Sequence, residues 1–189
     1  MNTNTPTKNT SSQFHIFSTS ILAVVCFGLA TALSSCTKRE TKIELYPLGS
    51  TQMVYHVTWY LEQWVKDGPF EEFYPDGKPL KKGGYSFARL MGKYKEWDQN
   101  GDWMEGKYRF GQKEGVFNHY YHNTGTKKRK ENYKNGVLHG DFTEWYPNGQ
   151  KKSEGKYAFK VDRRGRTDWF SSVKEGEWKT WNADGEAVK

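Results

Sequence analysis

Two sets of residues have types and spacings that could form a metal-binding or acid–base site. His119 and His122 are three residues apart, but no cysteine or carboxylate lies between them or directly beside them. In a strand their side chains would point to opposite faces, which does not suit a shared metal ion. Glu72, Glu96 and Glu144 recur at one position of a repeated pattern. Stacked carboxylates can form an acid–base pair or a cation site, but a solvated charge ladder is the simpler interpretation.

The sequence also lacks the short motifs that mark common catalytic and nucleotide-binding sites. No G-x-S-x-G, H-E-x-x-H, P-loop or G-x-G-x-x-G pattern is present. The many glycines are expected in turns and not in a phosphate-binding loop. We therefore predict that the protein is not an enzyme, with no catalytic residue, no metal ligand and no cofactor.

The elements that carry these residues repeat along the chain. In each unit a glycine is followed by one aromatic residue after two positions, a second after five, and a turn glycine after nine or ten. The opening glycines are Gly68, Gly92, Gly115, Gly140 and Gly176. The first aromatics are Phe70, Tyr94, Phe117, Phe142 and Trp178, and the second are Phe73, Trp97, Tyr120, Trp145 and Trp181. The turn glycines are Gly77, Gly101, Gly125, Gly149 and Gly185, and four of the units also end in a tyrosine.

This spacing predicts one β-hairpin in every 23–25 residues. Frequent glycines exclude long helices, and dipeptides such as Asp76-Gly77 predict two-residue type I′ turns. With those turns, Glu72 would face Lys81, and Trp97 would face Met104. The same reasoning predicts the pairs Phe73 with Leu80, Trp145 with Lys152 and Trp181 with Val188. The predicted fold is all-β, an elongated, twisted, antiparallel sheet of tandem hairpins in a single layer.

The pattern glycine-x-aromatic-x-x-aromatic-x-x-x-glycine resembles the MORN repeat, in the variant form of bacterial YwqK-like proteins. The resemblance covers residues 43–189, with units that open near 43, 68, 92, 115, 140 and 176. It implies an elongated sheet with a binding or scaffolding role. YwqK-like proteins are often described as antitoxins, which implies a second possible role in neutralising a toxin.

The first 35 residues resemble a bacterial lipoprotein signal peptide. An apolar stretch over 21–32 precedes Leu33-Ser-Ser-Cys36, which resembles a lipobox. We expect cleavage before Cys36, lipid attachment to that cysteine and a short tether over residues 36–42. The alternative is an uncleaved membrane anchor. Because Thr37 follows the cysteine where an aspartate would favour the inner membrane, we expect export to the outer membrane of a Gram-negative-type bacterium.

Composition fits an exported sheet. The 189 residues are 35% hydrophobic but 16% aromatic, which favours a thin sheet covered by rings. Cys26 and Cys36 both precede the repeats, so the repeat domain cannot contain a disulfide. The net charge of +7 permits nucleic acid or an anionic membrane as partner, but an exported protein is not expected to meet nucleic acid.

One interval between units is longer than the others and marks a candidate binding surface. Tyr157 and Gly176 are 19 residues apart, so an insertion over about 158–172 is expected to form either a functional loop or a longer hairpin. Units three and four also combine aromatic with basic residues, which favours cation–π contacts. The predicted surface comprises Tyr120, Tyr121, Trp145, Tyr146, Lys151, Lys152, Arg163, Arg164, Arg166 and Trp169.

These observations favour a membrane-anchored, non-catalytic MORN-repeat lipoprotein. Its partners are expected to be the membrane, reached through the N-terminal lipid, and a protein or polysaccharide of the envelope. The YwqK-like antitoxin is the alternative. Lipid attachment at Cys36 would favour the first role, and a full-length chain in the cytosol would favour the second.

Overall fold

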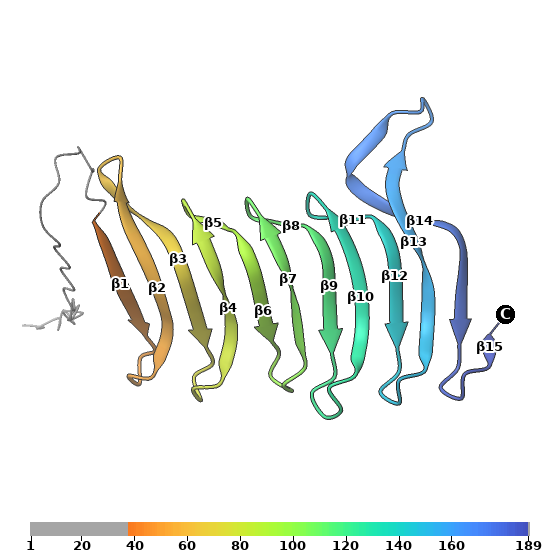
Figure 1. The fold of residues 1–189 in the computed structure, drawn as a ribbon, viewed down its shortest axis with the longest axis horizontal. Helices are drawn as coiled ribbons and strands as arrows, with labels where there is room; N and C mark the ends of the chain where they lie inside the picture. Colours follow the sequence, from red (N-terminus) through yellow and green to blue (C-terminus); the bar gives the residue numbers. More distant parts are fainter. Residues whose placement is uncertain (1–37, 189) are drawn as a thin grey trace, which may run out of the picture.

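A computed structural model describes residues 38–188, which form one open antiparallel sheet of 15 strands (Figure 1). This confirms the predicted elongated, single-layer, all-β fold. The first strands are β1 (Arg39–Leu45), β2 (Thr51–Tyr60), β3 (Gln63–Phe73), β4 (Pro79–Ser86), β5 (Arg89–Leu90), β6 (Gly92–Trp97), β7 (Trp103–Arg109) and β8 (Gln112–Lys113). The others are β9 (Gly115–Tyr120), β10 (Lys127–Lys134), β11 (Val137–Leu138), β12 (Gly140–Trp145), β13 (Lys151–Val161), β14 (Thr167–Trp181) and β15 (Ala187–Val188). Strands follow one another in sequence order, and β5, β8 and β11 pair with the ends of β4, β7 and β10.

The turn glycines lie along one edge of the sheet, which we call the lower edge, as it is drawn in Figure 1. Their turns differ from the predicted type I′. The amide of Gly77 donates to the carbonyl of Tyr74 at 2.9 Å, and the amide of Tyr74 donates to the carbonyl of Lys78. Only Gly77 has a positive φ, at 82°. This is a three-residue loop, a tight turn followed by a left-handed glycine, and the turns at Gly49, Gly101, Gly149, Gly165 and Gly185 repeat its hydrogen bonds.

The longer loop changes which side chains face one another beside the turns. Farther from the turn, Glu72 faces Lys81 as predicted. In the next hairpin, Trp97 faces Trp103, so the predicted pairing with Met104 is wrong. The same one-residue difference corrects three more predicted pairs. Phe73 faces Pro79 instead of Leu80, Trp145 faces Lys151 instead of Lys152, and Trp181 faces Ala187 instead of Val188.

Two-residue turns with two positive φ angles lie at the opposite edge, which we call the upper edge. They join β2 to β3 at Leu61-Glu62, β4 to β5 at Phe87-Ala88, β7 to β8 at Phe110-Gly111 and β10 to β11 at Asn135-Gly136. Only the last has the Asn-Gly sequence that this geometry favours. The sequence pattern therefore predicted the hairpins correctly and assigned type I′ turns to the wrong edge.

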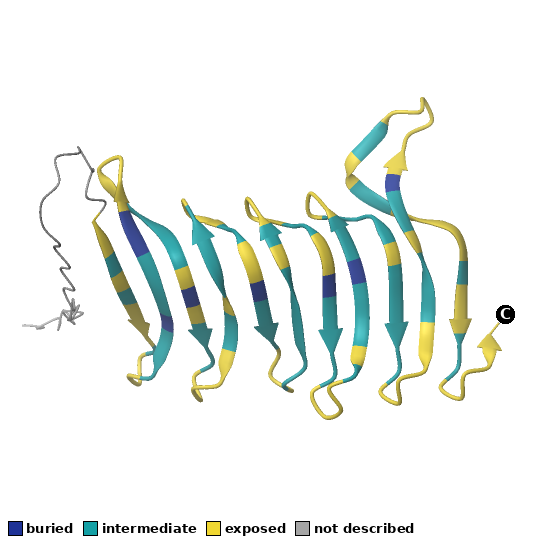
Figure 2. Cartoon of the chain, viewed as in Figure 1, coloured by how far each residue is buried: buried dark blue, intermediate teal, exposed yellow. Residues whose placement is uncertain are grey.

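Aromatic rings pack over glycines on one face of the sheet, which we call the aromatic face. Phe70 faces Gly83, Tyr94 faces Gly106 and Phe142 faces Gly155 across their strand pairs. Phe70 and Tyr94 are buried, and Phe117 is fully buried. Figure 2 shows that the buried residues lie within the strands and that the turns are exposed. Since each glycine leaves room for a ring, a single layer can bury an aromatic core.

Tyrosines at the lower edge join one repeat to the next. The hydroxyl of Tyr74 donates to the carbonyl of Trp97, and that of Tyr146 donates to the carbonyl of Trp181, at 2.9 and 3.1 Å. Tyr46 and Tyr121 make the same bond to the next repeat. Each bond stabilises the contact between neighbours, the interaction on which repeat proteins depend.

The structure differs from the prediction at the start of the repeats, and it shows which of the two expected forms the insertion takes. β1 begins at Arg39, inside the stretch 36–42 that was predicted to be a tether, because Arg39–Leu45 pairs with β2. The insertion forms a hairpin that extends β13 and β14 beyond the upper edge (Figure 1). The predicted signal peptide and Cys36 lie outside the described residues. Between residues 38 and 188 no helix is long and apolar enough to cross a membrane.

Candidate binding surface

The face opposite the aromatic rings, which we call the polar face, is hollowed and charged. A hollow of about 910 Å³ lies over β3 to β9 and a second of about 560 Å³ over β10 to β14. The first is lined by Lys82, Lys93, Lys95, Lys107, Glu71, Glu105 and Glu114, and the second by Lys130, Lys156, Lys179, Asp141, Glu154, Glu175 and Glu177. Lysines and carboxylates are nearly balanced in both. The face therefore offers paired charges along its length and not one basic patch.

A row of half-buried rings crosses the polar face close to the lower edge. It includes Trp97, Trp103, Tyr120 and Trp145, which come from three successive hairpins, the first two rings from the same one. Trp103 and Tyr120 stack with ring centroids 4.9 Å apart and planes 14° apart. The ammonium of Lys95 lies 5.0 Å from the ring centroids of both Trp97 and Trp103. The rings thus pack mainly on one another and on the lysine, and each keeps part of its surface exposed.

The structure separates the four predicted tyrosines and tryptophans of units three and four by role. Tyr120 and Trp145 belong to the ring row, and the Tyr120 hydroxyl donates to Glu105 at 3.2 Å. Tyr121 and Tyr146 use their hydroxyls for the bonds between repeats. Tyr120 and Trp145 can therefore contact a ligand, whereas the hydroxyls of Tyr121 and Tyr146 are already engaged.

The lysines predicted beside these rings are present but paired. Lys151 contacts Glu154 at 2.6 Å and Lys152 contacts Glu144 at 3.2 Å. The ammonium of Lys152 lies 6.0 Å from the ring centroid of Tyr146, and that of Lys151 lies 5.9 Å from Trp181. Lys152 thus lies near a ring of the predicted surface, whereas Lys151 lies near a ring outside it, and each charge already has a carboxylate partner.

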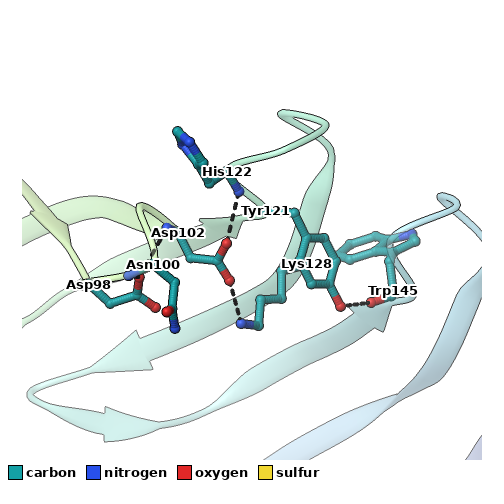
Figure 3. Close-up of polar contacts among 7 residues, drawn as sticks. All are labelled: Asp98, Asn100, Asp102, Tyr121, His122, Lys128 and Trp145. Carbon is teal, nitrogen blue, oxygen red and sulfur yellow. Dashed lines mark hydrogen bonds and ion pairs between the residues drawn. The ribbon is translucent and has the colours of Figure 1, made fainter.

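An ion pair replaces the tyrosine bond at one junction between repeats (Figure 3). Asp98 stands where four other repeats have a tyrosine. The carboxylate of Asp102 accepts from Lys128 Nζ at 2.7 Å and from the His122 amide at 2.8 Å. Burial alone would raise the pKa of the Asp102 carboxyl, but these bonds outweigh it and hold that pKa below its usual value. The bond to Asp102 also raises the pKa of Lys128. This junction is therefore held by charge as well as by sheet pairing.

The predicted residues of the insertion lie away from the ring row. Arg163, Arg164 and Arg166 occupy the turn between β13 and β14, beyond the upper edge, whereas the ring row runs close to the lower edge (Figure 1). Arg166 pairs with Asp162 at 2.8 Å. Trp169 packs against Phe159 with centroids 5.0 Å apart. The structure thus divides the predicted surface into two separate regions.

A buried carboxylate on the aromatic face was not predicted. Glu131 stands where the other repeats have Gly83, Gly106 and Gly155, and it faces Phe117. It contacts His119 Nε2 at 2.9 Å. It also contacts Arg129 Nε at 2.9 Å and the Tyr133 hydroxyl at 3.1 Å.

The surroundings of Glu131 shift two pKa values. Burial alone would raise the pKa of its carboxyl, but the bond from His119 and the charge of Arg129 outweigh burial and lower it. Burial lowers the pKa of the nearby Lys113 ammonium, whose Nζ lies 4.8 and 4.7 Å from the rings of Phe117 and Tyr133. The only signal in the sequence was a glutamate at a glycine position.

The other candidate groups have structural partners. Glu72 pairs with Lys81 at 3.4 Å, Glu96 accepts from the Tyr94 hydroxyl at 2.9 Å, and Glu144 pairs with Lys152 as described above. His119 contacts Glu131, whereas the backbone of His122 lies at the Asp102 junction. Among residues 38–188 no group of three or more histidine, cysteine or carboxylate side chains is arranged to hold a metal ion.

Comparison with known protein families finds a match at two of the hairpins. The family model of the MORN repeat variant matches residues 66–86 and 138–158. The first range covers the β3–β4 hairpin and the second the β12–β13 hairpin. A comparison with curated proteins gives no match. The intervening hairpins, β6–β7 and β9–β10, repeat the same pairing and the same placement of the first aromatic residue.

Proposed function

We propose that the chain, two of whose hairpins match the MORN repeat variant, is a membrane-tethered, non-catalytic scaffold that binds a protein or an envelope polymer on its polar face. The observation that carries this proposal is the contrast between the two faces. The rings of the aromatic face are packed over strand glycines, and Phe117 is fully buried. The polar face is open, with two hollows and a row of rings. An extended partner could contact several repeats of this face at once.

Charge and ring placement describe the partner that this face would suit. Lysines and carboxylates are mixed across the hollows, which favours a partner that carries both charges or many hydrogen-bonding groups. The ring row near the lower edge can pack against apolar groups or sugar rings. A protein segment or a polysaccharide meets these requirements better than a uniformly anionic polymer such as nucleic acid.

The tether is the second part of the proposal. The Leu33-Ser-Ser-Cys36 sequence after an apolar stretch supports cleavage before Cys36 and lipid attachment to it. Thr37 in place of an aspartate supports the outer membrane. Since β1 begins at Arg39, only two residues separate Cys36 from the strand. The scaffold would then lie directly at the membrane, and its partner would be a component of the envelope.

Photo-cross-linking in intact cells tests the polar face. A photoreactive residue is introduced at Lys107 or Lys130, which line the two hollows, and at Leu48 as the control. Leu48 lies in a lower-edge turn and is 99% exposed. We expect a discrete cross-linked product from positions 107 and 130 and none from 48. The same product from all three positions, or none from the two hollows, would contradict binding on this face. A toxin captured by a full-length cytosolic chain would instead support the antitoxin role.

A further inference from the structure

The upper edge carries large apolar side chains that keep most of their surface exposed, although Phe87 also packs edge-on against Tyr60 with ring centroids 5.0 Å apart. Leu61, Phe87 and Phe110 are 76%, 56% and 57% exposed. Each stands at the first position of a two-residue turn with a positive φ, between 44° and 50°. A residue other than glycine, asparagine or aspartate in this conformation is strained by on the order of 1–2 kcal/mol. Asn135 at the equivalent turn shows the residue type that suits the geometry.

The insertion hairpin adds a second apolar group beyond the same edge. Asp168 faces Lys160 and the next pair is Ser172 with Phe159, so residues 169–171 form a bulge. A bulge redirects side chains, and here Phe170 is 87% exposed and Trp169 57% exposed. Trp169 packs on Phe159, which in turn stacks on His139 with centroids 4.5 Å apart. The base of the hairpin is thus held in place while Phe170 points into solvent.

Basic residues flank these apolar groups. Arg89 follows the Phe87-Ala88 turn, Arg109 precedes Phe110, and Arg163 and Arg164 occupy the tip of the insertion. Within residues 38–188 none of these four arginines makes an ion pair, whereas Arg166 pairs with Asp162. Aromatic residues next to unpaired arginines are typical of protein surfaces that enter the headgroup region of an anionic bilayer.

The chain also enters the sheet at this edge. Arg39 faces Thr58, near the upper end of β2, and the first described residue, Lys38, is two residues after Cys36. Two extended residues span at most about 7 Å. A lipid on Cys36, which belongs to the function proposed above, would therefore hold the upper edge and not the lower edge against the membrane.

From these observations we propose that the upper edge is a membrane-contacting edge, in which Leu61, Phe87, Phe110 and Phe170 enter the headgroup region of an anionic bilayer. Arg163 and Arg164 bind lipid phosphates. The sheet then stands on the membrane with its strands directed away from it, and its polar face remains accessible from the side. This orientation rests on the proposed tether for its position, but the apolar tips and the arginines are independent of it.

Depth-dependent fluorescence quenching tests this orientation in the full chain. Phe110→Cys, Phe170→Cys and, as the control, Leu48→Cys are each introduced with Cys26→Ser and labelled with an environment-sensitive dye. The proteins are reconstituted in vesicles of phosphatidylethanolamine and phosphatidylglycerol, with or without a quencher attached to the lipid. We expect a blue shift and strong quenching at positions 110 and 170, and neither at 48.

Two readouts separate this inference from the tether. If the protein sediments with the vesicles but positions 110 and 170 are no more quenched than 48, the membrane-contacting edge is wrong and the tether stands. If Cys36 carries no lipid, its free thiol would also take the dye, so the measurement is repeated with Cys36→Ser; quenching at positions 110 and 170 in that background would mean that the edge contact stands and the tether is wrong. Replacing Arg163 and Arg164 with glutamine should reduce the quenching at 170, whereas Lys78→Gln at the lower edge should not. Equal quenching in both variants would overturn the role of the arginines.

Discussion

Gly106→Ala tests whether the strand glycines exist to accommodate aromatic rings. A methyl group on Gly106 would lie 2.6 Å from the ring atoms Cγ and Cδ1 of Phe117. The ring would have to move by about 0.8 Å to reach ordinary contact. It is fully buried and lies between Tyr108 and Tyr133, with centroid distances of 5.7 and 5.3 Å. The ring therefore has little space into which it can move.

The expected loss of stability follows from two opposing effects. Overpacking in a well-packed core costs about 1–3 kcal/mol, and the close packing around Phe117 places this site near the upper end. Replacing a strand glycine by alanine otherwise stabilises by about 0.5–1 kcal/mol. The net loss should be about 1–2 kcal/mol, which corresponds to a fall of about 3–6 °C in Tm for a domain of this size.

Thermal and urea unfolding of Gly106→Ala and Gly84→Ala provide the measurement. Gly84 is also a strand glycine, but a methyl group there would meet two backbone carbonyl oxygens, that of Met91 at 3.3 Å and that of Gly68 at 3.8 Å, and no ring. Its substitution should change stability by less than about 0.5 kcal/mol. Phe117→Leu should recover part of the loss when it is combined with Gly106→Ala. Equal stability of the two alanine variants would refute the role assigned to the ring-over-glycine pairs.

Three further substitutions test other contacts. Tyr146→Phe removes the hydroxyl that donates to the carbonyl of Trp181. It should lower the free energy of unfolding, measured in urea, by about 0.5–1.5 kcal/mol. No change would mean that this bond does not couple the repeats. Gly101→Val and Gly149→Val both place a β-branched residue at a positive φ, and each should lower the free energy of unfolding by more than about 1 kcal/mol. The loss should be larger at Gly101, because the added Cβ would also lie 2.8 Å from the His122 ring. Glu131→Gln should destabilise by about 1–3 kcal/mol at neutral pH. The folded-state pKa of Glu131 lies below its unfolded value near 4.5. The stability that its charge contributes is therefore complete above that value and is lost as pH falls through the folded pKa. Urea unfolding at several pH values should show the difference in stability between the variant and wild type shrinking below about pH 4.5, and a constant difference would contradict the assignment.

The repeat and its single-layer sheet could be predicted from sequence because glycine and aromatic positions recur at a fixed spacing. The turn type could not be assigned from Asp76-Gly77 alone, since the same dipeptide fits a two-residue loop or the last two residues of a three-residue loop. The difference of one residue changes the partner of Trp97 from Met104 to Trp103. Pro75 before the dipeptide was the available signal, because proline favours the first central position of an ordinary turn.

The candidate surface was predicted less completely because its geometry depends on which edge each segment reaches. Tyr120 and Arg164 are both near aromatic or basic neighbours in sequence, but the path of β13 carries the insertion beyond the upper edge. The burial of Glu131 was also beyond sequence reasoning, since it depends on rings contributed by two strands. The charged hollows of the polar face follow from strand alternation once the register is known.

Lipid labelling of the full chain in growing cells, followed by membrane fractionation, tests the central claim most directly. The wild-type chain and Cys36→Ser are compared after growth with labelled palmitate. A membrane-tethered scaffold should incorporate the label, migrate as the processed chain that begins at Cys36, and sediment with the outer membrane, whereas Cys36→Ser should carry no label. An unlabelled, full-length wild-type chain in the cytosolic fraction would contradict the proposed function.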